Sequence, residues 1–499
     1  MCKNRRFALT LGWFVAMAWT SVAAASQAAE QSAQADRAEA IRKTLAGVDK
    51  TLKAAGGTWE AWAEKMKPFR EDMQRIVKEY KWPWPAKGNL CFQGKSVELL
   101  MADTLDAWRP FEAIVHWDRQ LKARGIDLIV MPIPSKLSIY PDYFSEKAPE
   151  NRIVEISTKH LVRRLLENDI EVVDLHALYR EYRRQNGDDP YLYYDRDGHW
   201  RNLAVQLAAQ ELASRLKRYG FVQEASAKNP YASKPGSRSD GPKADRLRLI
   251  FEQAGGRPCQ DAPDSPIVLT GDSHAVYNAN RGAGLTAQVA FHVGLPLTLL
   301  ATEGLGPDMP VAMAQLEKER GFLAGRRVVI WSFTERSFPR ARDQVWPVVS
   351  LPEVAGRKPA ATVTRIEARA TVAMAGLPPA KNAPYAHYIM RLYVTDLVDA
   401  GGKKIGTGDG VLRILAMRHR IILPIAKAAK GDGLAVKLTS WAEVQAKYGK
   451  IQSEALPDID LEIDKPHYWA ELPDQPALDA KDLSVVGEDA APKGGAGTK

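Results

Sequence analysis

The sequence predicts an α/β fold built on a doubly wound parallel sheet, with a β-rich module at its C-terminal end. Between residues 90 and 337, short apolar runs suited to buried strands alternate with amphipathic stretches of helical length. Strands separated by helices favour a parallel sheet with helices on both faces. From residue 359 onward, alternating segments are divided by glycine turns, which is typical of a small antiparallel β module.

The elements of the α/β region follow from their apolar patterns. The clearest strand is 126–132, where Asp127 interrupts an otherwise apolar run that suits a strand buried on both faces. Further strands are expected at 170–175, 267–270 and 327–333, and helices at 108–124, 154–168 and 203–216. The basic stretch 226–240, rich in Gly, Ser and Pro, is expected to be an exposed excursion. In such a sheet, chemistry gathers at the carboxyl ends of the strands.

The first 25 residues have the layout of a secretory signal peptide. Lys3, Arg5 and Arg6 precede an apolar run over 7–19, and small residues follow over 21–25, so cleavage near Ala25 is expected. The apolar run is shorter than the roughly 20 residues that a membrane-spanning helix prefers. The pattern predicts export to the periplasm, with an uncleaved anchor as the alternative.

A helical extension is expected between the signal and the α/β region. Over 35–80, large apolar residues recur every three to four positions, at Trp59, Trp62, Met66, Phe69 and Met73. This spacing predicts an amphipathic helix with a kink or break at Pro68. The stripe suits packing onto the body, and docking of a partner is the alternative. The Trp-Pro-Trp-Pro segment at 82–85 ends the helix, since proline lacks an amide donor.

Composition and charge restrict the class of protein. A chain of 499 residues with 45% hydrophobic and 26% charged residues has the size for two or more domains and an ordinary globular composition. The net charge of +9 favours an anionic partner, such as an acidic polysaccharide or an anionic membrane face. An evenly charged surface explains it as well. Nucleic acid is not expected as a partner of an exported chain without a recognisable binding motif.

The cysteines point to one disulfide bond. Cys2 lies in the predicted signal, which leaves Cys91 and Cys259 in the mature chain. Two cysteines in an exported protein suggest a bridge that closes a long loop, and two buried free thiols are the alternative. The nine histidines show no paired ligand spacing, so no metal site and no cofactor are expected.

Three side chains suited to acyl transfer occur in the predicted α/β region, residues 90–337. Asp197 and His199 stand two positions apart before the helix at 203–216, and Ser273 follows the strand at 267–270. A serine, an imidazole and a carboxylate are what transfer through an acyl-enzyme requires. Gly271 is expected to let the chain turn tightly after the strand and to leave the Ser273 amide facing a developing oxyanion. Each motif alone has a structural explanation, a turn for the serine and a helix N-cap for the aspartate.

These motifs resemble the SGNH-hydrolase-like domain of the alginate O-acetyltransferases AlgX and AlgJ. The matching segments are Asp197-Gly198-His199-Trp200, Gly271-Asp272-Ser273, 131–136 and 329–336. Their order matches as well, because the Asp/His pair precedes the serine, a circular permutation of the order in ordinary SGNH hydrolases. The resemblance covers roughly residues 90–337 and implies an SGNH-hydrolase-like doubly wound sheet.

The resemblance also implies a mechanism. His199 would take the proton of Ser273 as an acetyl donor is attacked, and Asp197 would hold the imidazole and stabilise its charged form. The acceptor would be a hydroxyl of an exopolysaccharide such as alginate. The acetyl donor would be supplied by a membrane-bound O-acyltransferase within an export and biosynthesis complex.

Three more side chains are candidates for orienting the donor or the polysaccharide: Arg336, Tyr277 and Lys136. A surface ion pair, core packing and an ordinary strand end are their structural alternatives.

AlgX-like proteins also carry a C-terminal carbohydrate-binding β module, and residues 359–473 occupy its place. Trp441 and Trp469, with Tyr448 and Tyr468, are candidates for stacking on sugar rings, and core packing is the alternative. The glycine-dense run 401–410 is expected to form hairpin turns rather than a phosphate loop. No cysteine follows Cys259, so a disulfide-stabilised form of the module is absent.

The expected division of the chain is a signal peptide over 1–25, a helical extension over 30–85, the catalytic domain over 86–350, the β module over 359–475 and a disordered tail over 476–499. Two other functions fit the same motifs. A polysaccharide acetyl-esterase or deacetylase would use water as the acceptor. A non-catalytic polysaccharide-binding scaffold would need no working triad.

Overall fold

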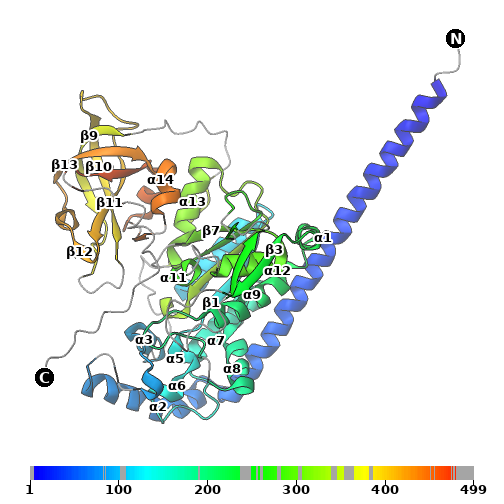
Figure 1. Ribbon diagram of the computed structural model, residues 1–499, viewed down its shortest axis with the longest axis vertical. Helices are drawn as coiled ribbons and strands as arrows, with labels where there is room; N and C mark the ends of the chain where they lie inside the picture. The colour runs from blue at the N-terminus through cyan, green and yellow to red at the C-terminus, as the bar shows by residue number, and fades with distance from the viewer. Residues whose placement is uncertain are drawn as a thin grey trace.

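Five parallel strands form the central sheet of the computed structural model, in the order β2-β1-β8-β6-β7. They are β1 (Asp127–Ile133), β2 (Glu171–Val172), β6 (Ile267–Gly271), β7 (Thr298–Ala301) and β8 (Val328–Thr334). Every residue of β6 and β8 is buried, as expected for strands covered on both faces. The predicted parallel sheet is therefore confirmed (Figure 1).

The structure describes residues 5–478 except 82–83, 85, 102–107, 189–190, 236–248, 254–256, 259–261, 278–282, 302–305, 339–345, 353–364, 381–385, 450, 455, 474 and 476–477. The side chains of residues 5–29, 89, 108, 233–235, 249–253, 257–258, 446 and 459–460 also lie outside this description. The predicted disordered tail falls almost wholly outside it, and of the predicted signal only the backbone of residues 5–25 is described.

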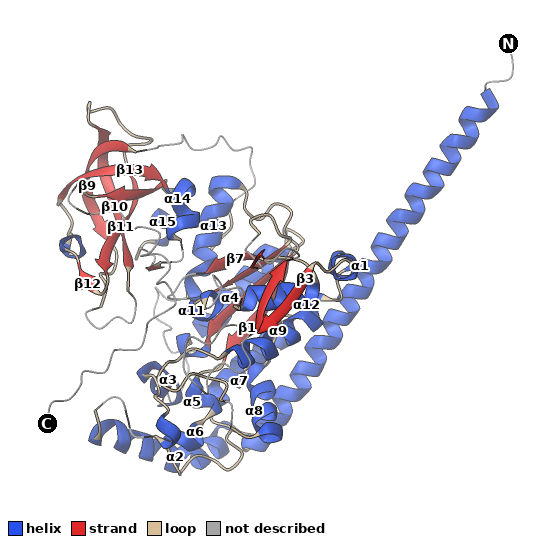
Figure 2. Ribbon diagram, viewed as in Figure 1, coloured by secondary structure: helices blue, strands red, loops and turns tan. Residues whose placement is uncertain are grey.

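Helices connect and cover the strands (Figure 2). They are α3 (Gly94–Met101), α4 (Trp108–Lys122), α5 (Lys136–Ile139), α6 (Pro141–Phe144), α7 (Ile156–Glu167), α8 (Leu175–Asn186), α9 (Asn202–Leu216), α10 (Gly220–Ala227), α11 (Ser273–Val276), α12 (Leu285–Val293) and α13 (Met309–Arg320). The chain steps outward in one direction from β1 to β2 and in the other from β6 to β7. Right-handed crossovers in opposite directions place their helices on opposite faces, which is the doubly wound arrangement.

Sequence patterns missed several of these elements. β7 has only four residues and no alternation, so its apolar run did not stand out from the neighbouring loop. Residues 227–230 of the expected excursion at 226–240 are exposed, but no sequence pattern indicated the short strand that follows them. β3 (Tyr231–Pro235) pairs with β4 (Leu249–Gln253), and β4 pairs with β5 (Arg257–Pro258), in a small antiparallel sheet.

The N-terminal extension consists of two helices, α1 (Arg5–Ala55) and α2 (Trp59–Glu79). The break lies at Gly56 and Gly57, both with positive φ, and the predicted break at Pro68 is wrong because α2 continues through that proline. Thr58 caps α2 by accepting a hydrogen bond from the Ala61 amide at 3.2 Å.

The apolar stripe of α2 packs onto the body, as predicted. Its buried members are Trp62, Met66, Phe69, Met73 and Ile76. The second half of α1 is held by Arg37, which pairs with Asp169 at 3.0 Å. In the part of the chain whose side chains are described, no helix has the length and hydropathy needed to cross a bilayer. The signal peptide stays a prediction.

The C-terminal module is a closed sheet of five main strands: β9 (Ile366–Ala375), β10 (Tyr388–Asp399), β11 (Gly410–Arg418), β13 (Gly433–Ser440) and β15 (His467–Glu471). β10 pairs with both β9 and β11, which closes the ring β11-β15-β13-β9-β10. The predicted β module is confirmed, with one correction to the expected antiparallel pattern, since β11 and β15 run parallel. The glycine-dense run 401–410 forms the turn between β10 and β11, as predicted.

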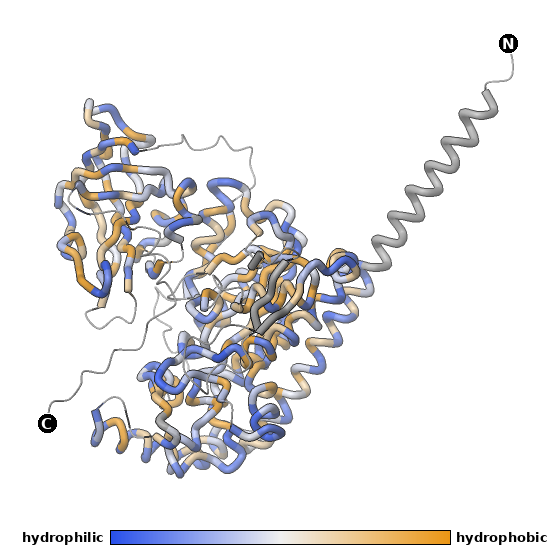
Figure 3. Tube along the Cα trace, in the orientation of Figure 1, coloured by the Kyte–Doolittle hydropathy of each residue, from blue (hydrophilic) through white to orange (hydrophobic). Residues whose placement is uncertain are grey.

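Short elements complete the module: β12 (Ile421–Ile422), β14 (Gln452–Ser453), α14 (Trp441–Tyr448) and α15 (Ile459–Asp464). The module is joined to the α/β body through α13. Arg413 of β11 donates to Gln315 Oε1 at 2.8 Å, and Lys318 pairs with Asp464 at 2.7 Å. Figure 3 shows apolar segments in both the body and the module, and each of the two has its own buried hydrophobic cluster.

A buried carboxylate ties the ends of two central strands together. Glu335, which directly follows β8, is fully buried and accepts hydrogen bonds from the Ser135 amide at 2.7 Å and from His176 Nε2 at 2.8 Å. The hydroxyls of Ser138 and Thr158 also donate to it. Burial acts to raise the pKa of Glu335, but the charge and hydrogen bond of His176 outweigh it and lower this pKa to about 2.

β6 and β8 approach each other very closely at Gly271. A Cβ atom at this position would lie 2.2 Å from the carbonyl oxygen of Ser332 and 2.7 Å from its Oγ. The packing of two central strands therefore requires glycine at position 271. The tight turn expected from the sequence does not explain this glycine, because its φ is not positive.

Gly271→Ala is expected to lower the free energy of unfolding by roughly 1–3 kcal/mol, the usual effect of overpacking a core. Gly47→Ala is the control, because a Cβ at Gly47 on α1 meets nothing within 4 Å. Alanine there should be neutral or should stabilise the helix by up to about 1 kcal/mol. Chemical denaturation measures both variants, and an unchanged midpoint for Gly271→Ala would contradict the packing argument.

Acid stability should depend on Glu335. Because its folded pKa lies below the ordinary value of 4.5, ionised Glu335 stabilises the fold above about pH 4.5, and this contribution is lost as the pH falls toward about 2. The shift corresponds to about 3 kcal/mol. Glu335→Gln should therefore lower stability at pH 7 and weaken its dependence on pH between these two values.

The exposed Glu181, paired with Arg184, supplies the control for this experiment. Glu181→Gln should change the free energy of unfolding by less than about 1 kcal/mol, because surface ion pairs contribute little. Denaturant titrations across the pH range measure both variants. If the free energy of unfolding depends on pH equally in the wild type and in Glu335→Gln, the prediction is wrong.

Candidate active site

Ser273, His199 and Asp197 form a continuous hydrogen-bonded line. The distance from Ser273 Oγ to His199 Nε2 is 2.9 Å, and the distance from His199 Nδ1 to Asp197 Oδ1 is 2.8 Å. The same carboxylate oxygen accepts from the His199 amide at 3.1 Å. The imidazole and carboxylate side chains are 16% and 20% exposed, so the line can be reached from solvent. A serine, a base and an orienting carboxylate in this order are the geometry of an activated nucleophile.

Asp272 fixes the position of the serine. Its carboxylate accepts from the amide and the hydroxyl of Thr334, at 2.8 and 2.9 Å, and from the His274 amide at 2.9 Å. The side chain thus caps α11 and binds the end of β8. Burial acts to raise the pKa of Asp272, but the His274 side chain, and to a smaller extent Arg336 and the Thr334 amide, keep this pKa well below its usual range. Ser273 is the first residue of α11, so its amide has no acceptor within the helix.

The Asp197/His199 loop reaches the serine from the connection before α9, as its position in the sequence predicts. It connects α8 to α9 rather than following a strand directly. The loop closes on itself through an antiparallel bridge between Tyr193 and Trp200. Trp200 Nε1 also donates to the His274 carbonyl at 3.2 Å, which ties the loop to the serine turn.

Two rings contact the imidazole of His199. The Tyr277 ring stacks on it with a centroid distance of 4.8 Å and an interplanar angle of 11°. The His274 ring lies at the same centroid distance, tilted by 38°. The structure thus places Tyr277 against His199, although the sequence suggested it only as a candidate for orienting substrate. His274 was missed, and its position next to the serine is the signal that points to it.

Electrostatics favour an ionised aspartate beside a neutral second histidine. Burial acts to raise the pKa of Asp197, but the charge and hydrogen bonds of His199 outweigh it and hold the pKa well below its usual range. Burial lowers the pKa of His274, despite the opposing effect of Asp272. Asp197 can therefore stabilise a proton taken up by His199 at neutral pH.

Arg336 and Lys136 both line a small pocket beside the triad. Its walls are Cys91, Gln93, Ser96, Pro134, Ser135, Lys136, Gly198, His274, Thr334 and Arg336. Arg336 is half-buried there, and its charge helps to lower the pKa of Asp272. Lys136 is almost fully buried, and its ammonium donates to main-chain carbonyls instead of facing open solvent.

The aromatic candidates of the β module do not form an exposed stacking surface. Trp441 and Trp469 are each 3% exposed, and Trp469 stacks on Tyr448 at 4.1 Å within a buried cluster. Tyr468 is buried in the module core. Sugar stacking needs an exposed ring face, so the predicted binding role of these residues is corrected to core packing.

Only one cysteine of the predicted disulfide bond lies among the described residues. Cys91 carries a free thiol in this structure, and Cys259 lies outside the described residues, so the bridge stays a prediction. Over the part of the chain with described side chains, no group of three or more His, Cys, Asp or Glu is arranged to hold a metal ion.

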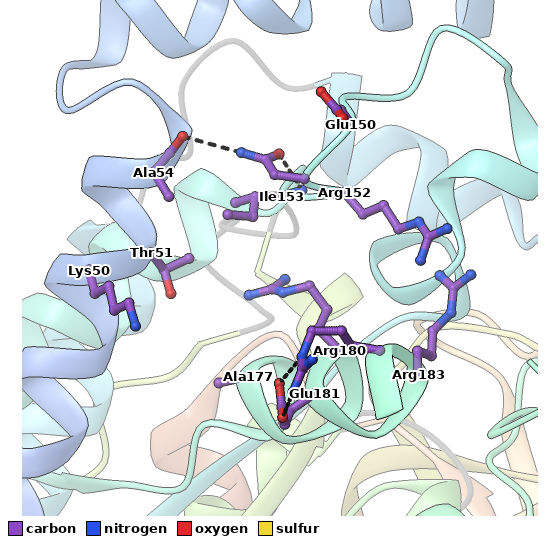
Figure 4. A pocket seen from close by; sticks show the side chains of 12 residues that line it. Lys50, Thr51, Ala54, Glu150, Arg152, Ile153, Ala177, Arg180, Glu181 and Arg183 are labelled. Atoms are coloured by element: carbon purple, nitrogen blue, oxygen red, sulfur yellow. Dashed lines mark hydrogen bonds and ion pairs between the residues drawn. The ribbon is translucent and has the colours of Figure 1, made fainter. Parts of the chain in front are cut away.

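A second hollow, of about 440 Å³, lies between α1, α8 and the segment around Arg152 (Figure 4). Several arginines line it, and each already has a carboxylate partner. Arg180 pairs with Glu155, Arg183 with Asp142 and Asp188, Arg184 with Glu181, and Arg152 with Asp142. This pairing explains the cluster as structural charge compensation.

One protein-family model matches part of the chain. The model of a family described as SGNH hydrolase-like domain, acetyltransferase AlgX, matches residues 103–250. The matched range contains Asp197 and His199 and ends before Ser273.

Two curated relatives are similar over part of the chain. The probable alginate O-acetylase AlgJ of Azotobacter vinelandii is 25% identical over 257 residues, which are 46% of this chain and 63% of that protein. Its counterpart from Pseudomonas aeruginosa is 24% identical over 253 residues, 45% of this chain and 62% of that protein. The chain therefore spans less than two thirds of the length of these curated relatives.

Two solved structures are also similar. The O-acetyltransferase domain of Pseudomonas putida AlgJ has a TM-score of 0.39 at 18% identity and covers 51% of this chain and 91% of its own. The structure of Pseudomonas aeruginosa AlgX has a TM-score of 0.38 at 17% identity, and the alignment covers 67% of this chain and 86% of that protein's chain. The family match over residues 103–250 and the curated relatives thus make this part of the chain similar to the SGNH hydrolase-like domain of the AlgX and AlgJ type, and the parallel sheet is consistent with that similarity.

Proposed function

We propose that the chain is a periplasmic O-acetyltransferase that moves an acetyl group through a Ser273 acyl-enzyme onto hydroxyls of an alginate-like exopolysaccharide. The observation that carries this proposal is the line of hydrogen bonds from Ser273 through His199 to Asp197. The names of the relatives, probable alginate O-acetylases, support the reaction and the substrate class. The net charge of +9 suits an acidic polymer.

The acylation step uses the hydrogen bonds already in place. As Ser273 Oγ attacks the acetyl carbonyl, His199 Nε2 accepts the hydroxyl proton, and Asp197 stabilises the imidazolium through Nδ1. The Ser273 amide is the proposed oxyanion donor, because it lacks an intrahelical acceptor. Collapse of the intermediate breaks the bond to the donor's leaving group, which takes the proton from His199.

The transfer step repeats this sequence with a sugar hydroxyl. His199 takes the proton of the incoming hydroxyl as its oxygen attacks the acetyl-serine carbonyl, and the proton returns to Ser273 Oγ when the ester bond to the enzyme breaks. A membrane-bound O-acyltransferase in an export complex is the proposed source of acetyl groups. If water replaced the sugar, the same residues would act as an acetyl-esterase.

Ser273→Ala should abolish acetyl transfer, because the alanine side chain has no nucleophilic oxygen. The assay combines the protein lacking residues 1–25, a generic acetyl ester and oligouronate acceptors, with acetylated oligomer and acetylated Ser273 measured by mass spectrometry. Ser214→Ala, an exposed serine on α9, is the matched control and should retain wild-type transfer. Ester cleavage without acetylated oligomer would replace the transferase by the esterase, and inactivity of the wild type would favour a binding scaffold.

Asp197→Asn should lower the rate of Ser273 acylation by roughly 10³–10⁴-fold, because an amide can neither stabilise the imidazolium nor hold the same tautomer. Asp195→Asn removes a neighbouring carboxylate that pairs with Arg201 at 2.7 Å and should change the rate by only a few fold. Single-turnover acylation measures both. Similar losses in the two variants would contradict the assigned role of Asp197.

A further inference from the structure

Lys136 occupies an unusual position for a lysine. It is the first residue of α5, directly after Ser135 at the end of β1, and it is only 4% exposed. Its Nζ donates to the Cys91 carbonyl at 2.8 Å and to the Asp195 carbonyl at 3.0 Å. Because both acceptors belong to the main chain, the role first considered for this residue, direct contact with donor or sugar, does not explain its burial.

The two carbonyls belong to segments far apart in sequence that meet at this lysine. The Cys91 amide donates to the same Asp195 carbonyl at 2.7 Å, so the ammonium completes a three-way junction. The segment of Cys91 and the loop of Asp195 also lie close together at Gln93 and Gly198. A Cβ at Gly198 would lie 2.2 Å from Gln93 Nε2, which shows how closely the loop lies against residues 91–93.

The loop that carries the triad acid and base needs such support. In its described residues, 187–188 and 191–201, the loop contains no helix and one isolated bridge, from Tyr193 to Trp200. Asp195 stands two residues before Asp197 and four before His199. A shift of this loop by about 1 Å would misalign His199 with the serine, and displacements of that size cost on the order of 100-fold in rate.

The charges around Lys136 suit a retained ammonium. Burial lowers its pKa to about 8, while Asp197 and Asp195 act to raise it and Arg201 acts to lower it. The group is therefore still mostly charged at neutral pH. Two carbonyl acceptors and a nearby carboxylate offset the desolvation of the cation.

We propose that Lys136 is a positioning residue, which fixes the Asp197/His199 loop against the end of β1 through the Cys91 and Asp195 carbonyls. The proposal deepens the function proposed above and rests on it only for its kinetic consequence. A residue that holds the loop affects the chemical step, whereas a residue that binds substrate mainly affects KM.

Lys136→Met tests the proposal in the protein lacking residues 1–25, since methionine keeps an unbranched side chain and removes all donors. Acylation of Ser273 by a generic acetyl ester should fall by roughly 100-fold in kcat with KM within a few fold. Amide hydrogen exchange in 191–200 should become roughly tenfold faster. Lys136→Arg, which keeps the charge and the donors, should recover part of both effects.

Lys159→Met is the matched control. Lys159 is fully buried as well, but its ammonium binds the Asp174 carboxylate at 2.5 Å and not the loop. This variant should lose global stability without a selective increase of exchange in 191–200. If Lys136→Met fails to fold, Lys136→Gln, which keeps one donor group, takes its place and should give the same pattern in weaker form.

The outcomes separate the two proposals. Wild-type ester acylation without polysaccharide transfer would reject the transferase and leave the Lys136 comparison valid. If the wild-type protein shows no acylation of Ser273, amide hydrogen exchange in residues 191–200 alone tests the positioning role of Lys136. Unchanged exchange in 191–200 on replacement of Lys136, or a raised KM at constant kcat, would overturn the positioning role.

Discussion

The hydrogen bonds from Thr334 to Asp272 join the ends of two central strands, and the position of the serine depends on them. Asp272 caps α11 with one carboxylate oxygen and binds the end of β8 with the other. Directly before it, Gly271 lets β6 and β8 approach until a methyl group would collide with the Ser332 carbonyl. Ser273 therefore projects from a junction with little freedom to move, which is what a preorganised nucleophile requires.

Buried charge organises the surroundings of that junction. Glu335 follows β8 by one residue and binds the turn after β1, while Lys136 begins the next helix and binds the loop of the acid and base. Each buried charge has several hydrogen-bonding partners, and removing one partner from such a group is costly. The strand ends, the serine turn and the Asp197/His199 loop are thus connected by polar contacts in a low-dielectric region, where those contacts are strong.

The fold was largely predictable where hydrophobic pattern and element length agree. The apolar runs at β1, β6 and β8 are long enough to stand out, and the run at 170–175 predicted β2, although only two of its residues pair as a strand, whereas the four residues of β7 were missed. The break of the N-terminal helix shows competing signals. Pro68 is tolerated within α2, while Gly56 and Gly57 adopt the positive φ that ends α1. In the module, the burial of Trp441 and Trp469 depends on the closure of the sheet, which aromatic content alone does not reveal.

By itself, the sequence determined the fold class and the three side chains of the candidate site, because strand periodicity and the Asp-x-His and Gly-x-Ser motifs are local properties of the chain. Only the tertiary structure decided how those side chains meet. The loop between α8 and α9 reaches Ser273 across 74 positions of sequence. The roles of Asp272, His274 and Lys136 likewise depend on contacts with β8, His199 and two distant carbonyls. Distances between remote segments are set by packing and buried hydrogen bonds, which no local pattern encodes.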